Sequence, residues 1–252
     1  MASLQIIDPE ELEWQGGYRA PFCSARGDVR SGMAVPDGFS QFVLYADLGP
    51  GAEVGWTDHH GDEGVFVLEG EVEVAGTVIP AKGAAVIEAG APASLRATTD
   101  ARLLHLGSTV PGPQSESVIG PPANDHPTVH AFGPDGKAVD VYDDIHQAFY
   151  ADSYCDGCRI ALFRISGPGP YVAASHIHTV DELITVTEGA LQVGPDTVGA
   201  VKTVAIPAER RYGFRTSGPW EFVNFRLDAS WYTAAPGSVP IRERIGAGTE
   251  TS

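Results

Sequence analysis

The stretch HIHTVDELITVTEG, residues 176–189, decides how the rest of the chain is interpreted. It places two histidines two residues apart, a glutamate four residues after the second, and a glycine seven residues further on. Residues two apart on a strand point to the same side, so His176 and His178 face one way. Glu182 lies at an even offset beyond a bend and can converge with them. Two imidazoles and one carboxylate form a ligand set typical of a mononuclear metal site with open positions for substrate.

The same pattern recurs in a weaker form earlier in the chain. Aligning Glu63 with Glu182 places Gly70 on Gly189, and the match extends along the chain: residues 41–51 match 159–169, 86–97 match 205–216, and 101–108 match 221–228. Each copy is a series of short alternating segments separated by glycine and proline, which predicts strands with one buried face. We therefore expect a first unit at residues 1–112, a proline-rich linker at 113–140 and a second unit at 141–252.

Motif and repeat together resemble the cupin superfamily. H-x-H-x3-E-x6-G is similar to the first cupin motif, and Pro207 to Tyr212 occupy the place of the second, P-x-G-x2-H. Because the unit occurs twice, the chain resembles a bicupin over roughly residues 38–232, with a looser similarity to the ureidoglycine aminohydrolases. The resemblance implies an all-β fold of two tandem jelly-roll (cupin) barrels joined by the linker, with the metal in the second barrel.

Tyr212 stands where cupins usually supply a third histidine. Three roles remain open for it: a phenolate ligand to the metal beside His176, His178 and Glu182, a catalytic group that passes a proton or orients substrate, and plain interior packing.

The first copy has lost part of the ligand set, because Thr57 and Ala93 stand at two of the ligand positions. We expect a structural barrel, with an irregular site around His59 and its neighbours Asp58 and His60 as the alternative. His105 aligns with Asn224 and is expected to be an interior group with satisfied hydrogen bonds.

Arginines near the second motif suggest the substrate class. Alternation predicts that Arg215 and Asn224 point inward, and an inward arginine suits a carboxylate-bearing substrate, so Arg215 is a second catalytic candidate. Arg164 and Arg226 lie on flanking strands, and Arg210 with its neighbour Arg211 is expected at the rim.

Charge and composition exclude several function classes. The net charge of −17 and pI near 4.7 disfavour nucleic acid and anionic membranes as partners. No apolar run reaches transmembrane length, and the first residues lack a signal-peptide pattern, so we expect a cytoplasmic protein. Of the three cysteines, Cys155 and Cys158 form a C-x-x-C that suits either zinc or redox chemistry or a simple turn, and Cys23 is apart.

These observations favour a metal-dependent enzyme acting on a small organic molecule, with a dioxygenase-type oxidoreductase preferred. The alternatives are a redox-neutral hydrolase, isomerase or lyase, and a non-enzymatic small-molecule-binding protein. We expect one divalent transition metal, with iron preferred and manganese, nickel, zinc or copper as alternatives. The expected assembly is a monomer or a homodimer.

Overall fold

Strands build both halves of the chain, as the alternating sequence predicts. The computed structural model describes residues 3–111, 126–152, 158–228 and 232–234. Within these ranges the regular structure is β-strand apart from one 3-10 turn, Pro9–Glu11. No helix in the described part of the chain is long and apolar enough to cross a membrane.

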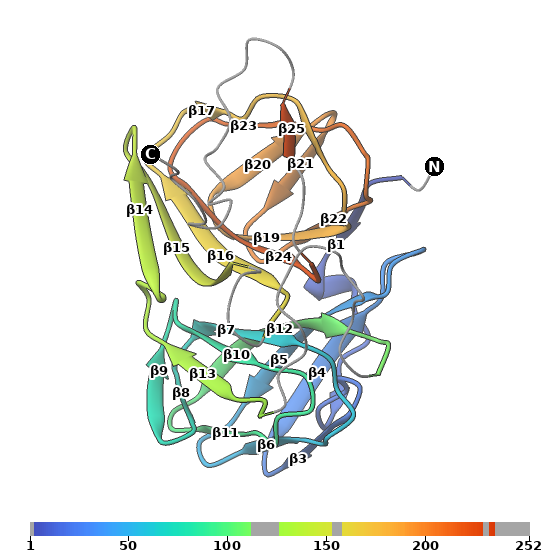
Figure 1. Cartoon of the computed structure of the whole chain (residues 1–252), viewed down its shortest axis with the longest axis vertical. Helices are drawn as coiled ribbons and strands as arrows, with labels where there is room; N and C mark the ends of the chain where they lie inside the picture. Colours follow the sequence, from blue (N-terminus) through green and yellow to red (C-terminus); the bar gives the residue numbers. More distant parts are fainter. Residues whose placement is uncertain (1–2, 112–125, 153–157, 229–231, 235–252) are drawn as a thin grey trace, which may run out of the picture.

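The first barrel, in blue to green in Figure 1, joins a seven-stranded sheet (order β13-β10-β7-β12-β5-β4-β2) to a five-stranded one (β3-β6-β11-β8-β9). All pairings are antiparallel. The strands are β2 (Gln15–Gly16), β3 (Cys23–Arg26), β4 (Val29–Ala34), β5 (Gln41–Leu48), β6 (Glu53–Trp56), β7 (Glu63–Glu69), β8 (Glu71–Val74), β9 (Thr77–Pro80), β10 (Ala84–Ile87), β11 (Ser94–Ala97), β12 (Ala101–Ser108) and β13 (Val129–Phe132).

The second barrel has the same plan. Its seven-stranded sheet (β1-β22-β19-β24-β16-β15-β14) faces a four-stranded sheet (β17-β23-β20-β21) and the pair β18-β25. The strands are β1 (Gln5–Ile7), β14 (Ala138–Tyr142), β15 (Ile145–Asp152), β16 (Ala161–Gly167), β17 (Tyr171–Val172), β18 (His176–His178), β19 (Glu182–Glu188), β20 (Ala190–Val193), β21 (Asp196–Gly199), β22 (Thr203–Ile206), β23 (Phe214–Thr216), β24 (Trp220–Arg226) and β25 (Tyr232–Ala234).

Strand register agrees with the sequence repeat. His105 on β12 pairs with Val65, two residues after Glu63, and Asn224 on β24 pairs with Ile184, two residues after Glu182. Both strand pairs also carry a register shift at the corresponding place, beside Arg102 in one barrel and after Val186 in the other. The two copies therefore place equivalent side chains inside equivalent barrels.

The motif glycine has a backbone role. Gly189 turns the chain between β19 and β20 with a φ of +71°, and a Cβ there would lie 2.2 Å from the carbonyl oxygen of Pro219. Gly70, its counterpart, has a φ of +75°, and a Cβ would lie 2.0 Å from the oxygen of Asp100. Only glycine fits a left-handed turn with so close an approach.

The barrels pack through their larger sheets, which share one apolar core (Figure 1). Its members include Val43, Tyr45, Phe66, Val86, Leu104 and Leu106 from the first barrel and Leu162, Leu183, Ala205, Val223 and Phe225 from the second. The N-terminal strand β1 crosses over and pairs with β22. Polar contacts add to this interface, because the Tyr45 hydroxyl lies 2.6 Å from that of Thr203. Such burial of apolar surface is the main force that joins the two units.

Candidate active site in the second barrel

His176 and His178 both point into the second barrel. His176, the first residue of β18, forms two backbone hydrogen bonds with Tyr212. The whole of β18 also pairs with β25. Both imidazoles are buried, with ring centroids 5.1 Å apart. His176 Nδ1 lies 2.7 Å from the carbonyl oxygen of Ala174, which can only accept. Nδ1 therefore carries the proton, and Nε2 is the ring nitrogen that could bind a metal.

Glu182 begins β19 and is almost wholly buried, at 1% exposure. Its two carboxylate oxygens have different partners: the Tyr212 hydroxyl donates to Oε2, and the Asn224 side-chain amide donates to Oε1. Oε1 also lies 3.7 Å from His178 Nε2. Asn224 thus points inward, as alternation on β24 predicts.

Arg226 is the site residue that the sequence reasoning did not place inside the barrel. It is 3% exposed, and its Nη1 donates to His178 Nδ1 at 3.1 Å, while its Nε lies 3.9 Å from Glu182 Oε1. Its guanidinium also lies over the ring of Phe163, 5.4 Å from the centroid. The sequence spacing could have predicted this position, because Arg226 follows Asn224 by two residues on one strand and both side chains therefore face the same side.

These neighbours determine the charge state of Glu182. Burial opposes ionisation, but the charges of His178 and Arg226 and the hydrogen bonds from Asn224 and Tyr212 outweigh it and lower the pKa of Glu182 to about 2. The carboxylate is therefore ionised at neutral pH inside an apolar barrel.

A small cavity lies among these groups, and about 20 Å³ of it is open to the centre of a water molecule. That is room for roughly one water or one ion. Its polar lining is His176, His178, Glu182, Tyr212 and Asn224, and its apolar lining is Phe163, Ile165, Ile184, Phe214 and Phe222.

The donor set at this cavity fits a divalent cation. Each oxygen of Glu182 accepts one hydrogen bond and retains a second lone pair. His176 offers Nε2, whereas His178 Nδ1 faces the guanidinium of Arg226. The ring of His178 must therefore turn away from Arg226 and carry its proton on Nδ1 before Nε2 can bind a cation. In the described part of the chain, only Cys23, Glu63 and His105 of the first barrel form a group of three with ligand atoms all within 4.8 Å of one another. The motif residues are more widely spaced and must close around an ion.

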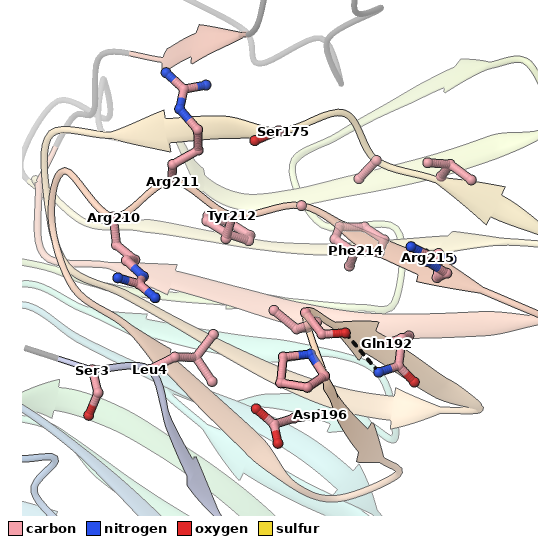
Figure 2. A pocket seen from close by; sticks show the side chains of 16 residues that line it. Ser3, Leu4, Ser175, Gln192, Asp196, Arg210, Arg211, Tyr212, Phe214 and Arg215 are labelled. Carbon is pink, nitrogen blue, oxygen red and sulfur yellow. Dashed lines mark hydrogen bonds between the residues drawn. The ribbon is translucent and has the colours of Figure 1, made fainter.

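Tyr212 separates this cavity from a larger outer pocket of about 530 Å³ (Figure 2). Arg210, Arg211 and Arg215 line the outer pocket together with Asp196 and Gln192. In Figure 2, Arg210 and Arg215 lie on either side of Tyr212, and Arg211 extends the other way.

The inward orientation expected for Arg215 is wrong. Its side chain is exposed, because alternation on β23 buries Phe214 and Thr216 instead. Arg215 belongs to the outer pocket and not to the interior. Arg164 also lies away from the cavity, where it pairs with Glu221 at 2.5 Å.

In the first barrel, the residues that retain the motif are dispersed. His59 is exposed beside Asp58, and both ring nitrogens of His60 face backbone carbonyl oxygens, those of Gly61 at 2.6 Å and Ala91 at 2.9 Å. These three residues do not form the irregular site considered as an alternative. Glu63, in contrast, is buried inside the barrel.

The C-x-x-C motif is only partly described. Cys158 is buried and disulfide-bonded, whereas Cys155 lies outside the described residues. A sulfur in a disulfide is not a thiolate, so Cys158 in this form is not a zinc ligand.

Known structures share this architecture, although no protein-family model and no curated protein matches the sequence. A putative glyoxylate-induced protein from Pseudomonas aeruginosa is 17% identical, with a TM-score of 0.67 over 89% of both chains. Variants of oxalate decarboxylase from Bacillus subtilis are 12–13% identical, with TM-scores of 0.67 over 93% of this chain and 80% of theirs. One of these oxalate decarboxylase structures is described with Mn(II) centres. The similarity confirms the predicted fold: the chain has two tandem jelly-roll barrels, arranged as in these proteins.

Proposed function

We propose that the second barrel is the active site of a metal-dependent enzyme that acts on a small carboxylate, with a divalent cation held by His176, His178 and Glu182. The observation that carries the proposal is the position of Tyr212. It lines both the arginine-bordered outer pocket and the polar cavity, and its hydroxyl bonds to Glu182. One side chain therefore connects the place where an anion arrives with the place where a cation would be held.

The cation would supply Lewis-acid polarisation of a substrate oxygen. Iron is the metal preferred from the sequence, and the Mn(II) centres of the oxalate decarboxylase neighbour support manganese as an alternative. Tyr212 is then the candidate proton donor, since it lines the cavity and its hydroxyl proton is donated to Glu182. The positive charge of Arg226, whose Nε lies 3.9 Å from Glu182 Oε1, balances the negative charge of this carboxylate.

Outer-pocket arginines support an anionic substrate. In a chain of net charge −17, the cluster of Arg210, Arg211 and Arg215 reverses the local sign of the surface. A positive rim attracts a carboxylate and orients it toward Tyr212. The names of the structural neighbours, which refer to oxalate and glyoxylate, support the same substrate class.

Two reaction types compete at this site. The ligand set of two histidines and one carboxylate supports the dioxygenase-type reaction preferred from the sequence. The hydroxyl–carboxylate contact of Tyr212 and Glu182, together with the decarboxylase neighbours, supports a redox-neutral reaction driven by proton transfer. Oxygen uptake during turnover distinguishes them: consumption of O2 with substrate supports the dioxygenase, and full turnover without O2 supports the redox-neutral enzyme.

Arg215→Met tests the carboxylate part of the proposal. Metal-loaded protein is assayed by NMR against carboxylates of about two to four carbons, the size class of the oxalate and glyoxylate to which the names of the structural neighbours refer. We expect KM to rise by about tenfold with kcat nearly unchanged, since one charge-assisted contact to substrate is lost. Arg96→Met is the matched control, because Arg96 is an exposed arginine of the first barrel that pairs with Glu73. An Arg215→Met enzyme with the KM of the Arg96→Met control would contradict the role of the rim.

A further inference from the structure

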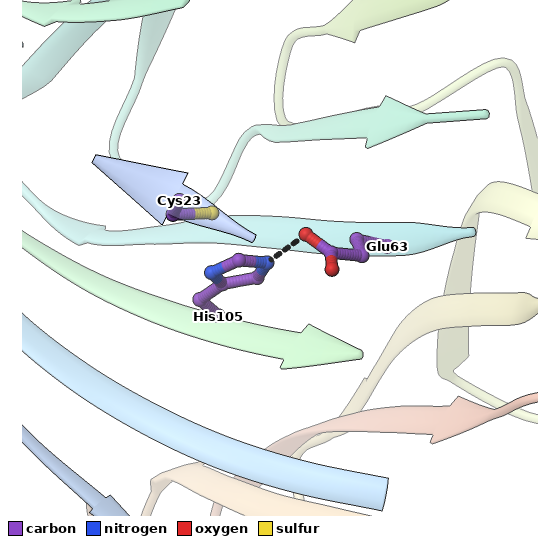
Figure 3. Close-up of side chains that lie close together, drawn as sticks. All are labelled: Cys23, Glu63 and His105. Carbon is purple, nitrogen blue, oxygen red and sulfur yellow. Dashed lines mark hydrogen bonds and ion pairs between the residues drawn. The ribbon is translucent and has the colours of Figure 1, made fainter. Parts of the chain in front are cut away.

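Three side chains from distant parts of the chain meet inside the first barrel: Cys23 of β3, Glu63 of β7 and His105 of β12 (Figure 3). Each offers a metal-ligating atom, and these atoms all lie within 4.8 Å of one another. Glu63 and His105 are wholly buried, and Cys23 is half-buried. Only Glu63 belongs to the sequence motif, so the cluster is not the motif site in another form.

Glu63 carries an unsatisfied carboxylate oxygen. Its Oε2 accepts from the indole nitrogen of Trp56 at 2.5 Å and lies 2.7 Å from His105 Nε2. Its Oε1 is buried and has no hydrogen-bond partner among the described residues. A buried polar atom without a partner costs about 1–3 kcal/mol, and more when the group is charged. The open atom is therefore a position at which a ligand would be stabilised.

The negative charge of the buried glutamate is balanced differently in the two barrels. In the second barrel, Arg226 lies 3.9 Å from Glu182. The strand register places Gly107 at the position of Arg226, and a Cβ on Gly107 would lie 2.9 Å from Cγ of Glu63. No side chain fits there. Across the described residues, His105 is the only ion-pair partner of Glu63.

We propose that Cys23, Glu63 and His105 form a second metal site, one that takes a thiophilic divalent cation such as Zn²⁺. Thiolate, imidazole and carboxylate are the three ligand types of zinc, and three protein ligands leave one position open. Tetrahedral geometry needs roughly 3.4–3.6 Å between ligand atoms, so small rotations of the three side chains suffice. The cation lies beside Glu63 in the place that the guanidinium of Arg226 takes beside Glu182 in the second barrel.

Tyr18 orients the imidazole for this role. Its hydroxyl lies 3.0 Å from His105 Nδ1, and both groups are buried. In the metal-free structure Nε2 carries the proton and donates it to Glu63 at 2.7 Å. When a cation binds, the ring proton moves to Nδ1, which then donates to the Tyr18 hydroxyl, and the Nε2 lone pair becomes available to the cation. A hydrogen bond from the outer ring nitrogen is the usual way in which a metal-bound histidine is fixed. When the metal binds, the S–H bond of Cys23 breaks, the proton leaves to solvent, and a sulfur–metal bond forms.

Co²⁺ is the probe, because a cobalt–thiolate bond gives a near-ultraviolet charge-transfer band. The cavity of the second barrel has no cysteine among its described lining residues, so a cation held there does not give this band. The full chain is stripped with a chelator, kept non-reduced, and titrated with Co²⁺. We expect the band to saturate at one equivalent above any binding in the second barrel. Cys23→Ser should abolish it, and His59→Ala, which alters an exposed histidine of the same barrel, should leave it unchanged.

Two further measurements keep the inference testable if Cys23→Ser folds poorly. Zn²⁺ should protect the Cys23 thiol of the unaltered protein from alkylation. Tyr18→Phe should weaken Zn²⁺ binding by about 10–100-fold, the usual effect of removing the group that orients a metal-bound histidine. A Co²⁺-saturated chain without the thiolate band, or an alkylation rate unchanged by Zn²⁺, would overturn the proposal. Neither result bears on metal bound by the second barrel.

Discussion

Replacing Glu182 by alanine is expected to lower the free energy of unfolding by about 3–5 kcal/mol and to remove metal from the second barrel. The stability loss follows because Arg226 stays buried without its carboxylate, and the hydrogen bonds from Tyr212 and Asn224 are lost as well. Urea unfolding followed by circular dichroism measures the first effect, and elemental analysis measures the second.

Glu188→Ala is the control for that change. Glu188 ends the same strand, but its side chain is 59% exposed and lies 3.9 Å from Lys82, so its removal should cost less than about 1 kcal/mol. Equal destabilisation by the two variants would contradict the account of the buried carboxylate.

The dependence of folding stability on acid pH should also change when Glu182 is replaced. The pKa of Glu182 falls from its ordinary 4.5 to about 2 in the folded chain. A depressed carboxylate pKa contributes stability that is fully present above the unfolded value and is lost as pH falls through the folded one. In metal-free protein, Glu182→Ala should therefore flatten the loss of stability between pH 4.5 and 2. An unchanged slope would show that Glu182 is not the group responsible.

Turnover of Tyr212→Phe is expected to fall by about 10²–10⁴-fold while its metal content stays the same, as for a lost general acid or base. The structure supports this outcome because the hydroxyl already donates to Glu182, which leaves the ring to pack beside His176 at a centroid distance of 4.4 Å. If the phenol were a ligand, metal affinity would fall and any colour with ferric ion would vanish. If it only packed, the variant would be silent.

Tyr171→Phe is a suitable control for the tyrosine. Tyr171 packs against Phe214 and Trp220 in the same barrel and does not line either pocket. It should retain full activity. A Tyr212→Phe enzyme as active as Tyr171→Phe would remove Tyr212 from the catalytic groups.

Local spacing was sufficient to predict much of this molecule. The spacing of His176, His178 and Glu182 predicts their common orientation, and Gly189 marks the turn that only glycine can make. Repetition of this unit predicts two barrels of the same plan. Each of these inferences depends on residues within one or two neighbouring strands, where alternation and turn geometry are reliable.

Contacts between distant strands could not be predicted in this way. Cys23 and His105 are 82 positions apart by their numbers, and only the closed barrel brings them to Glu63. The inward orientation of Arg215 was wrongly predicted for a different reason: on the three-residue strand β23 the alternation runs through Phe214 and Thr216, which leaves Arg215 on the outer face. The pairing of β1 with the second barrel likewise depends on how the two units pack.

Anomalous X-ray scattering from crystals of the metal-loaded full chain tests the central claim most directly. We expect a peak in the second barrel at about 2.0–2.2 Å from a nitrogen of His176, a nitrogen of His178 and an oxygen of Glu182. Fully loaded crystals with no peak at these three side chains, whether or not Cys23 and His105 hold an ion, would contradict it.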